Sequence, residues 1–133
     1  MPQINAGFPG MTELVKKLHK QGYSIHTASN EPEFDLDQYL KGMGIRDYFG
    51  HLFGADIVGI LKYSKTFYER VFSYSGVEPE QAIVIEDKPK NIHFIEELGA
   101  TAVQSLFDGI FEPVTEYSFS TAEQLAEILK KLS

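Results

Sequence analysis

The chain has 133 residues, which is enough for one domain with a hydrophobic core and too few for two. Apolar residues make up 43% and charged residues 23%, as in ordinary globular proteins, and no apolar run approaches the length of a membrane span. The net charge of −7 has no basic stripe to offset it, so we expect neither nucleic acid nor a membrane as a partner. The absence of cysteine excludes disulfides and thiolate metal sites, and is compatible with a cytoplasmic location.

Apolar residues alternate between helical and strand spacing along the chain. A helical stripe runs from Leu14 to Leu18, and Gly22 follows it as a helix stop. Ser64 is placed to cap a later helix, and Ser120-Thr121-Ala122-Glu123 is a capping-box sequence before the last one. The expected elements are an irregular lead-in at 1–9, helices at 11–21, 33–41, 64–76, 89–98 and 120–132, and strands at 23–28, 52–58, 82–85, 101–106 and 115–119.

This alternation predicts a single α/β domain over residues 1–133. The expected fold is three-layered and Rossmann-like, with a mostly parallel sheet and helices on both faces. Right-handed crossovers then bring the carboxyl ends of the strands to one rim, which is where ligands bind in open α/β sheets.

The stretch from Ala82 to Asp87 carries the strongest chemical signal. Ala82–Ile85 is an apolar run, which predicts a strand buried on both faces. Glu86 and Asp87 follow at its end, and adjacent carboxylates repel each other unless a cation lies between them. Hard oxygen ligands suit Mg²⁺. The alternative interpretation, a pair of solvated acids beside the positive end of the next helix, stays open at this point.

Further polar residues are expected at the same rim. A hydroxyl, an ammonium group and a carboxylate pair are the parts of a phosphate-and-metal site. On sequence alone, the simpler interpretation is that the hydroxyl belongs to a turn ahead of Pro32 and that the lysines are solvated. The clusters are Ser29 with Asn30, Lys62 with Lys65, and Glu86 with Asp87.

Four stretches occur in a specific order. They are Gly7-Phe8-Pro9-Gly10-Met11 before Ser29-Asn30, Gly59-Ile60-Leu61-Lys62 before Phe67-Tyr68, Gly76-Val77-Glu78-Pro79-Glu80 before Ile83-Val84-Ile85-Glu86-Asp87, and Gly99-Ala100-Thr101. Over about residues 7 to 107, this set resembles the second to fourth motifs of the haloacid dehalogenase superfamily, which consists mostly of Mg²⁺-dependent phosphohydrolases.

The resemblance implies a role for each matching residue toward a small phosphorylated substrate or phosphate. Ser29, with Asn30 beside it, would hydrogen-bond the phosphoryl group, and Lys62 would stabilise its charge. Glu86 and Asp87 would hold Mg²⁺ directly or through water. Two residues are secondary candidates: Asn91, which stands where many relatives have a second aspartate, and Lys65, which competes for the lysine role.

The family's first motif, an apolar strand that ends in Asp-x-Asp and carries the nucleophile, has no match here. The first aspartate is Asp35, in a predicted helix, and the family's cap insert is also missing. The sequence therefore resembles the carboxy-terminal part of a truncated core that lacks its central strand, and we expect this chain alone to be inactive. The lead-in, direct pairing of the flanking strands, or a strand from a partner chain or second copy could fill the central position.

Two other functional hypotheses remain. The chain could be a non-catalytic haloacid dehalogenase-like module that binds partners. It could also be a receiver-type phosphorylation domain, although such a domain has its acids first and its lysine last, the reverse of the order seen here.

Overall fold

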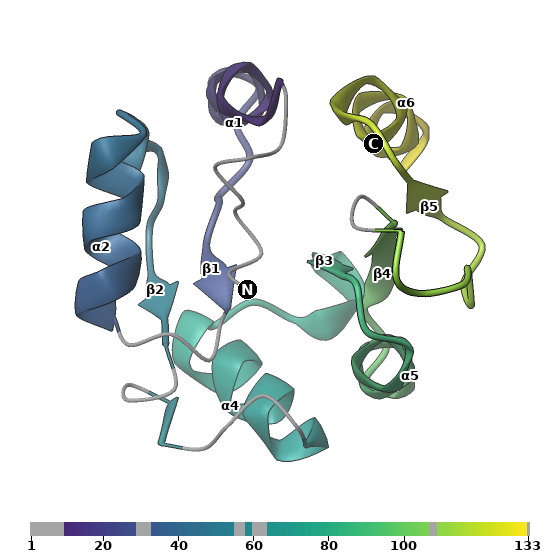
Figure 1. Cartoon of the computed structure of the whole chain (residues 1–133). Helices are drawn as coiled ribbons and strands as arrows, with labels where there is room; N and C mark the ends of the chain where they lie inside the picture. Colours follow the sequence, from purple (N-terminus) through teal and green to yellow (C-terminus); the bar gives the residue numbers. More distant parts are fainter. Residues whose placement is uncertain (1–9, 29–32, 55–57, 60–63, 107–108, 133) are drawn as a thin grey trace. The chain divides into compact units, whose positions relative to one another are not determined.

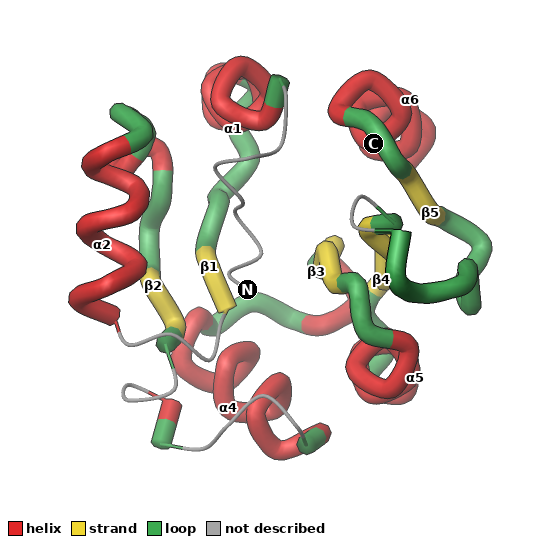
Figure 2. The backbone as a smooth tube through the Cα atoms, viewed as in Figure 1, coloured by secondary structure: helices red, strands yellow, loops and turns green. Residues whose placement is uncertain are grey.

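A computed structural model describes residues 10–28, 33–54, 58–59, 64–106 and 109–132 (Figures 1 and 2). The chain divides into two compact units, Met1–Leu61 and Lys62–Ser133. Helices alternate with parallel strands in both units, so the predicted α/β class is confirmed. The expected lead-in lies outside the described residues, and the single-domain organisation stays a prediction. No helix in the described ranges is both long and apolar enough to span a membrane.

In its described residues, the first unit contains one pair of parallel strands, in the register that places Thr27 opposite Leu52. The first helix ends as predicted, because Gly22 adopts a φ of 96°, a conformation that glycine allows without strain. The elements are α1 (Met11–Lys20), β1 (Thr27–Ala28), α2 (Glu33–Gly42), the 3-10 helix η1 (Arg46–Tyr48) and β2 (Leu52–Phe53).

Both strands of the first unit are shorter than the sequence predicts. β2 ends at Phe53 because the chain bends there: the Gly54 N–H donates to the Leu52 carbonyl at 3.1 Å. The Val58 N–H then donates to the Gly54 carbonyl at 3.0 Å, which is a helical pattern rather than a strand. The expected strand at 52–58 is therefore wrong at Gly54 and Val58, and residues 55–57 lie outside the described residues.

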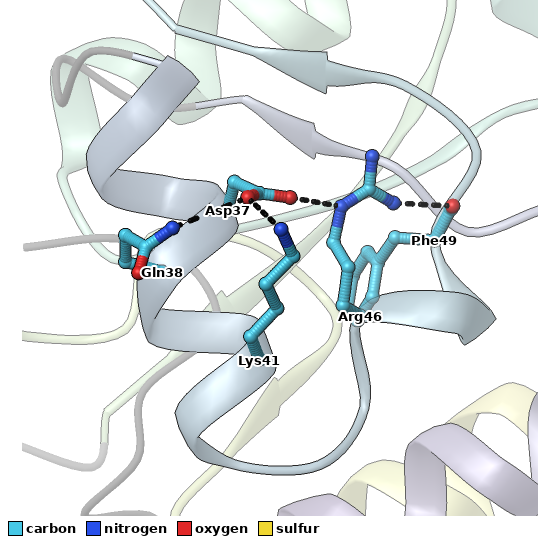
Figure 3. Close-up of polar contacts among 5 residues, drawn as sticks. All are labelled: Asp37, Gln38, Lys41, Arg46 and Phe49. Atoms are coloured by element: carbon cyan, nitrogen blue, oxygen red, sulfur yellow. Dashed lines mark hydrogen bonds and ion pairs between the residues drawn. The ribbon is translucent and has the colours of Figure 1, made fainter.

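A polar cluster joins α2 to η1, as Figure 3 shows. The Asp37 carboxylate accepts from Arg46 Nε at 2.7 Å and pairs with Lys41 Nζ at 2.7 Å. Arg46 also donates through Nη1 to the Phe49 carbonyl at 3.0 Å. Asp35-Leu36-Asp37 is an Asp-x-Asp sequence, but it lies on helix α2 with Leu36 in the core, so it does not supply the missing strand motif.

The second unit contains a three-stranded parallel sheet in the order β3-β4-β5. In the view of Figure 1, α6 lies above these strands and α5 below them. Apolar residues from α5, β4, β5 and α6 form its core, including Ile95, Val103, Phe119 and Leu125. The elements are α4 (Lys65–Ser75), the 3-10 helix η2 (Pro79–Gln81), β3 (Ile83–Glu86), α5 (Pro89–Glu97), β4 (Thr101–Ser105), β5 (Ser118–Phe119) and α6 (Ala122–Leu132).

The structure corrects two of the predicted helix caps. Ser64 occupies the N-cap position of α4, but its side chain makes no capping hydrogen bond. The side-chain cap of α6 is shifted by one residue: Thr121 Oγ1 accepts from the Gln124 N–H at 3.1 Å. Gln124 Oε1 in turn accepts from the Ser120 N–H at 2.6 Å. Thr121-x-x-Gln124 fits the capping-box sequence pattern as well as the predicted Ser120-x-x-Glu123, but its return bond reaches the residue before the N-cap.

The apolar residues of β3 are only partly buried, so the expectation that Ala82–Ile85 is buried on both faces is wrong. β3 is the end strand of the three strands described for this unit, whereas β4, which lies between two strands, is buried at Ala102, Val103 and Gln104. The end strand of a sheet retains more accessible side-chain surface than a central one.

Candidate functional site

The candidate site lies where β3 ends. Glu86 is the last residue of β3, opposite Gln104 of β4, and Asp87 follows it. α5 begins two residues later at Pro89, a favourable first helical position. The structure therefore places both acids at the carboxyl end of the strand and close to a helix N-terminus, whose partial positive charge favours them.

Glu86 is buried, with 1% of its surface exposed, and its carboxylate accepts four hydrogen bonds. Oε1 accepts from the Tyr68 hydroxyl at 2.7 Å and from Asn91 Nδ2 at 3.2 Å. Oε2 accepts from the backbone N–H groups of Asp87 at 2.9 Å and Lys88 at 3.2 Å. A carboxylate offers about four lone-pair positions, and these donors use all of them. A buried charge is tolerated when it is satisfied in this way.

Tyr68 comes from α4 and is 1% exposed. Burial raises the pKa of its hydroxyl far above the usual value, and the neighbouring Glu86 carboxylate raises the pKa further. The phenol therefore stays protonated and remains a hydrogen-bond donor to Glu86. The charge of Asp87 raises the pKa of this hydroxyl as well, to a smaller extent.

Asn91 lies in the first turns of α5 and is 3% exposed. Its side-chain nitrogen donates to Glu86 Oε1, so Asn91 helps to hold this carboxylate in place. The Asp87 and Lys88 N–H groups bind the same carboxylate. Glu86 thus fixes the backbone of the turn that presents the Asp87 side chain.

Lys65 lies elsewhere. Its Nζ is 3.6 Å from Glu97 Oε2, and both side chains are about two-fifths exposed, at 41% and 42%. Glu97 is the last residue of α5, whereas Asn91, which contacts Glu86, lies near the start of that helix. The Lys65 ammonium group is therefore held near the opposite end of α5 from Glu86. Ser29, Asn30 and Lys62 lie outside the described residues.

A divalent cation would find one candidate carboxylate here rather than two. Mg²⁺ usually binds one or two carboxylates together with water or phosphate oxygens. The oxygens of Glu86 already accept four hydrogen bonds, so Asp87 is the residue of this pair suited to direct coordination. Among the residues that the structure describes, no three His, Cys, Asp or Glu side chains are grouped to hold a metal ion. The donor set fits a Mg²⁺ ion held by one carboxylate, with other ligands from solvent or substrate.

Two residues that sequence analysis did not assign to the site contribute to it. The sequence places Tyr68 beside Phe67 among the apolar residues of α4, which predicts a core position. The hydroxyl group, which Phe67 lacks, was the available signal for a polar role. Gln104 is fully buried (0% exposed), and its Nε2 donates to the Asp87 carbonyl at 3.2 Å. The one available signal for Gln104 was a polar residue inside the apolar strand Thr101–Ser105.

Comparison with known proteins agrees with this fold. The sequence model for haloacid dehalogenase-like hydrolases matches residues 4–99. A phosphoglycolate phosphatase of Rhodospirillum rubrum is 25% identical over 80% of this chain and 44% of its own length. Flavin mononucleotide hydrolase 1 of Arabidopsis thaliana is 33% identical over 68% of this chain and 36% of its own length. The chain thus spans less than half of each of these relatives.

Solved structures show the same fold. A phosphatase structure from Thermococcus onnurineus superposes with a TM-score of 0.80, covering 92% of this chain and 57% of that one at 24% sequence identity. This agreement supports the predicted Rossmann-like arrangement of parallel strands and helices.

Proposed function

The chain belongs to the haloacid dehalogenase-like hydrolase family, and from that premise we propose that it carries the metal- and phosphate-binding part of a phosphatase site. The expected ligands are Mg²⁺, which the family resemblance implies, and a small phosphorylated molecule, because the matched relatives include a phosphoglycolate phosphatase and a flavin mononucleotide hydrolase. The observation that carries the proposal is the satisfied Glu86 carboxylate, which holds the Asp87 turn at the end of β3.

Each residue has a distinct part in this proposal. Asp87 coordinates the metal ion, and Glu86 orients Asp87 through the backbone of the turn. Mg²⁺, when bound, would neutralise charge on the phosphoryl oxygens. By family resemblance, Ser29 and Asn30 hydrogen-bond the phosphoryl group, and Lys62 stabilises its negative charge.

The proposal includes the absence of turnover by these 133 residues alone. Nucleophilic catalysis in this family needs an aspartate at the end of an apolar strand. Asp35-Leu36-Asp37, which has the spacing of that motif, lies on helix α2, with Asp37 paired to Lys41 and Arg46.

Calorimetric titration of Mg²⁺ in the presence of inorganic phosphate tests the binding site. We expect saturable binding to the wild-type chain and its loss in Asp87→Asn. Asp47→Asn is the matched control, because Asp47 is exposed and the substitution removes the same charge. Equal binding by all three proteins would place the ion elsewhere and contradict the proposal.

Hydrolysis of p-nitrophenyl phosphate tests the absence of turnover separately. We expect none above background with or without Mg²⁺. Mg²⁺-dependent hydrolysis that is lost in Asp87→Asn would show that the chain supplies its own nucleophile. If Mg²⁺ and phosphate both fail to bind, a non-catalytic interaction module becomes the better description.

A further inference from the structure

Gln104 connects the candidate site to a second segment of the chain. Besides the Asp87 carbonyl, its Nε2 binds the Glu112 carbonyl at 3.0 Å, and its Oε1 accepts from the Val114 N–H at 2.8 Å. One buried amide therefore joins the Asp87 turn to residues 109–114, which we call the 109–114 loop. We propose that Gln104 is a positioning residue that couples this loop to the Asp87 turn and so makes the loop part of the metal-and-phosphate site.

The hydrogen-bond chemistry makes the coupling specific. A primary amide has two N–H donors on one nitrogen and an acceptor oxygen. Gln104 directs both donors at main-chain carbonyls, one from each segment, and its acceptor at a main-chain N–H. Because all three partners are backbone atoms, the contact fixes the path of the chain on both sides. The loop cannot move away from the turn without leaving buried polar groups of Gln104 unsatisfied, and such groups are costly.

The position of Gln104 directs this coupling to the site. Gln104 lies opposite Glu86 in the β3–β4 register, and its own N–H donates to the Tyr117 carbonyl at 2.8 Å in the β4–β5 pairing. Its backbone is therefore held in the sheet while its side chain binds the two segments beyond the strand ends. The Asp87 turn is held from two sides, by Glu86 through its N–H groups and by Gln104 through its carbonyl.

Among the apolar side chains of the loop, Phe111 is half-buried and the others are exposed. Ile110 is 72% exposed and Val114 is 51% exposed. The Gln104 side chain provides the described hydrogen bonds to Glu112 and Val114. We therefore expect the position of this loop to depend on Gln104 and to be transmitted to Asp87.

Two sets of variants separate coupling from general destabilisation. Val114→Pro removes the N–H that binds Gln104 Oε1 at an exposed position, and Val114→Ala keeps it and is the matched control. Gln104→Met removes the amide at similar volume, and Gln81→Met at an exposed site is its control. Gln104→Met changes a buried residue of the sheet and could prevent folding. If the Gln104→Met protein does not fold, Val114→Pro alone tests the coupling.

Amide hydrogen exchange of the full chain, without metal, decides the coupling. In Val114→Pro we expect the Asp87 and Lys88 amides to exchange about tenfold faster than in Val114→Ala, while β4 amides stay unchanged. Equal exchange of the Asp87 and Lys88 amides in the two variants would overturn the proposal, because the loop would then be independent of the turn.

Titration with Mn²⁺, a paramagnetic substitute for Mg²⁺, gives a readout that a purely structural role would not change. This readout rests on the proposed function. We expect Mn²⁺ to broaden the amide signals of residues 87–88 and 110–112 in the wild type, with an affinity about tenfold weaker in Val114→Pro. Broadening at 87–88 without broadening in the loop would overturn the inference and leave the proposed function intact. No broadening at 87–88 would overturn the proposed function, and the exchange experiment would still decide the coupling.

Discussion

The two units of the chain hold their parallel strands with different kinds of hydrogen-bond acceptor. In the first unit, His26 Nδ1 accepts from the His51 N–H at 2.9 Å, next to the β1–β2 pair. In the second unit, the buried Glu86 carboxylate accepts four hydrogen bonds at the end of β3. Both are single side chains that fix the backbone at the edge of a short sheet.

The two acceptors differ in their surroundings. His26 is partly exposed and stacks against His51 with ring centroids 5.2 Å apart, so a second titratable ring faces it. Glu86 is enclosed, and its Tyr68 partner is held in the protonated form. The comparison teaches that the candidate site encloses its acceptor beside a phenol that keeps its proton, whereas the first unit uses an acceptor that can itself take up a proton.

The largest expected effect is at Glu86. Glu86→Gln places an NH₂ group among four donors, and at least one buried donor must then lose its acceptor. We expect the free energy of unfolding to fall by about 3 kcal/mol. Urea denaturation measures it, and Glu116→Gln, an exposed site in the same unit, is the control. A loss equal to that of the control would show that the network does not stabilise the unit.

The next effect isolates the hydroxyl of Tyr68. Tyr68→Phe keeps the buried ring and removes one donor to a charged acceptor, so we expect a loss of about 2 kcal/mol. Tyr74→Phe is the matched control, because Tyr74 is 54% exposed. If both variants lose the same stability, the contrast between an enclosed and an exposed acceptor loses its basis.

The pH dependence of the first unit sharpens the comparison. Burial, followed by the charge of His51, holds the pKa of His26 below its usual 6.5, so the unfolded chain binds this proton more tightly. The stabilisation is therefore complete above 6.5 and is lost as the pH falls below that value. The hydrogen bond to His26 changes stability with pH in the same direction. Nδ1 accepts the His51 N–H through a lone pair, and protonation of Nδ1 removes that lone pair.

Denaturation of the wild type and His26→Asn between about pH 8 and pH 5 tests this dependence. Asparagine can present an oxygen near the position of Nδ1 without taking up a proton in this range. We expect the wild type to lose stability toward pH 5 and His26→Asn to give a flatter profile. His93→Gln serves as a control, because His93 is exposed and pairs with Glu97 in the second unit. Parallel profiles for wild type and His26→Asn would contradict the assignment to His26.

The sequence predicts most of the helices because apolar spacing and stop residues are local signals. Gly76, for example, ends α4 with a φ of 73°, as its position after the apolar stripe indicates. Strand ends were harder to predict, because the pairing partner decides them. The chain bends at Gly54 although the apolar pattern continues to Val58.

The site shows the same division between local and non-local signals. The acids at the end of β3 follow from an apolar run that stops at two carboxylates. The sequence does not predict that the two acids have different hydrogen-bond partners. These partners are distant in the chain: Tyr68 lies 18 positions before Glu86, and Gln104 lies 17 positions after Asp87. Lys65 is a further case, since its pairing with Glu97 depends on how α4 packs against α5.

The smallest expected effect is at Asp37, whose ion pairs are partly exposed. The hydrogen bond from Lys41, followed by that from Arg46, holds the pKa of Asp37 below its usual value, so this stabilisation is present above about pH 4 and is lost as the pH falls. At low ionic strength and neutral pH, Asp37→Asn should be slightly less stable than the control Asp47→Asn. In about 1 M salt the difference should shrink, because salt weakens ion pairs that are exposed to solvent. A difference that persists undiminished in salt would mean that Asp37 holds η1 mainly through the geometry of its hydrogen bond to Arg46. Salt would then have as little effect on this contact of the first unit as we expect for the buried hydrogen bonds of Glu86.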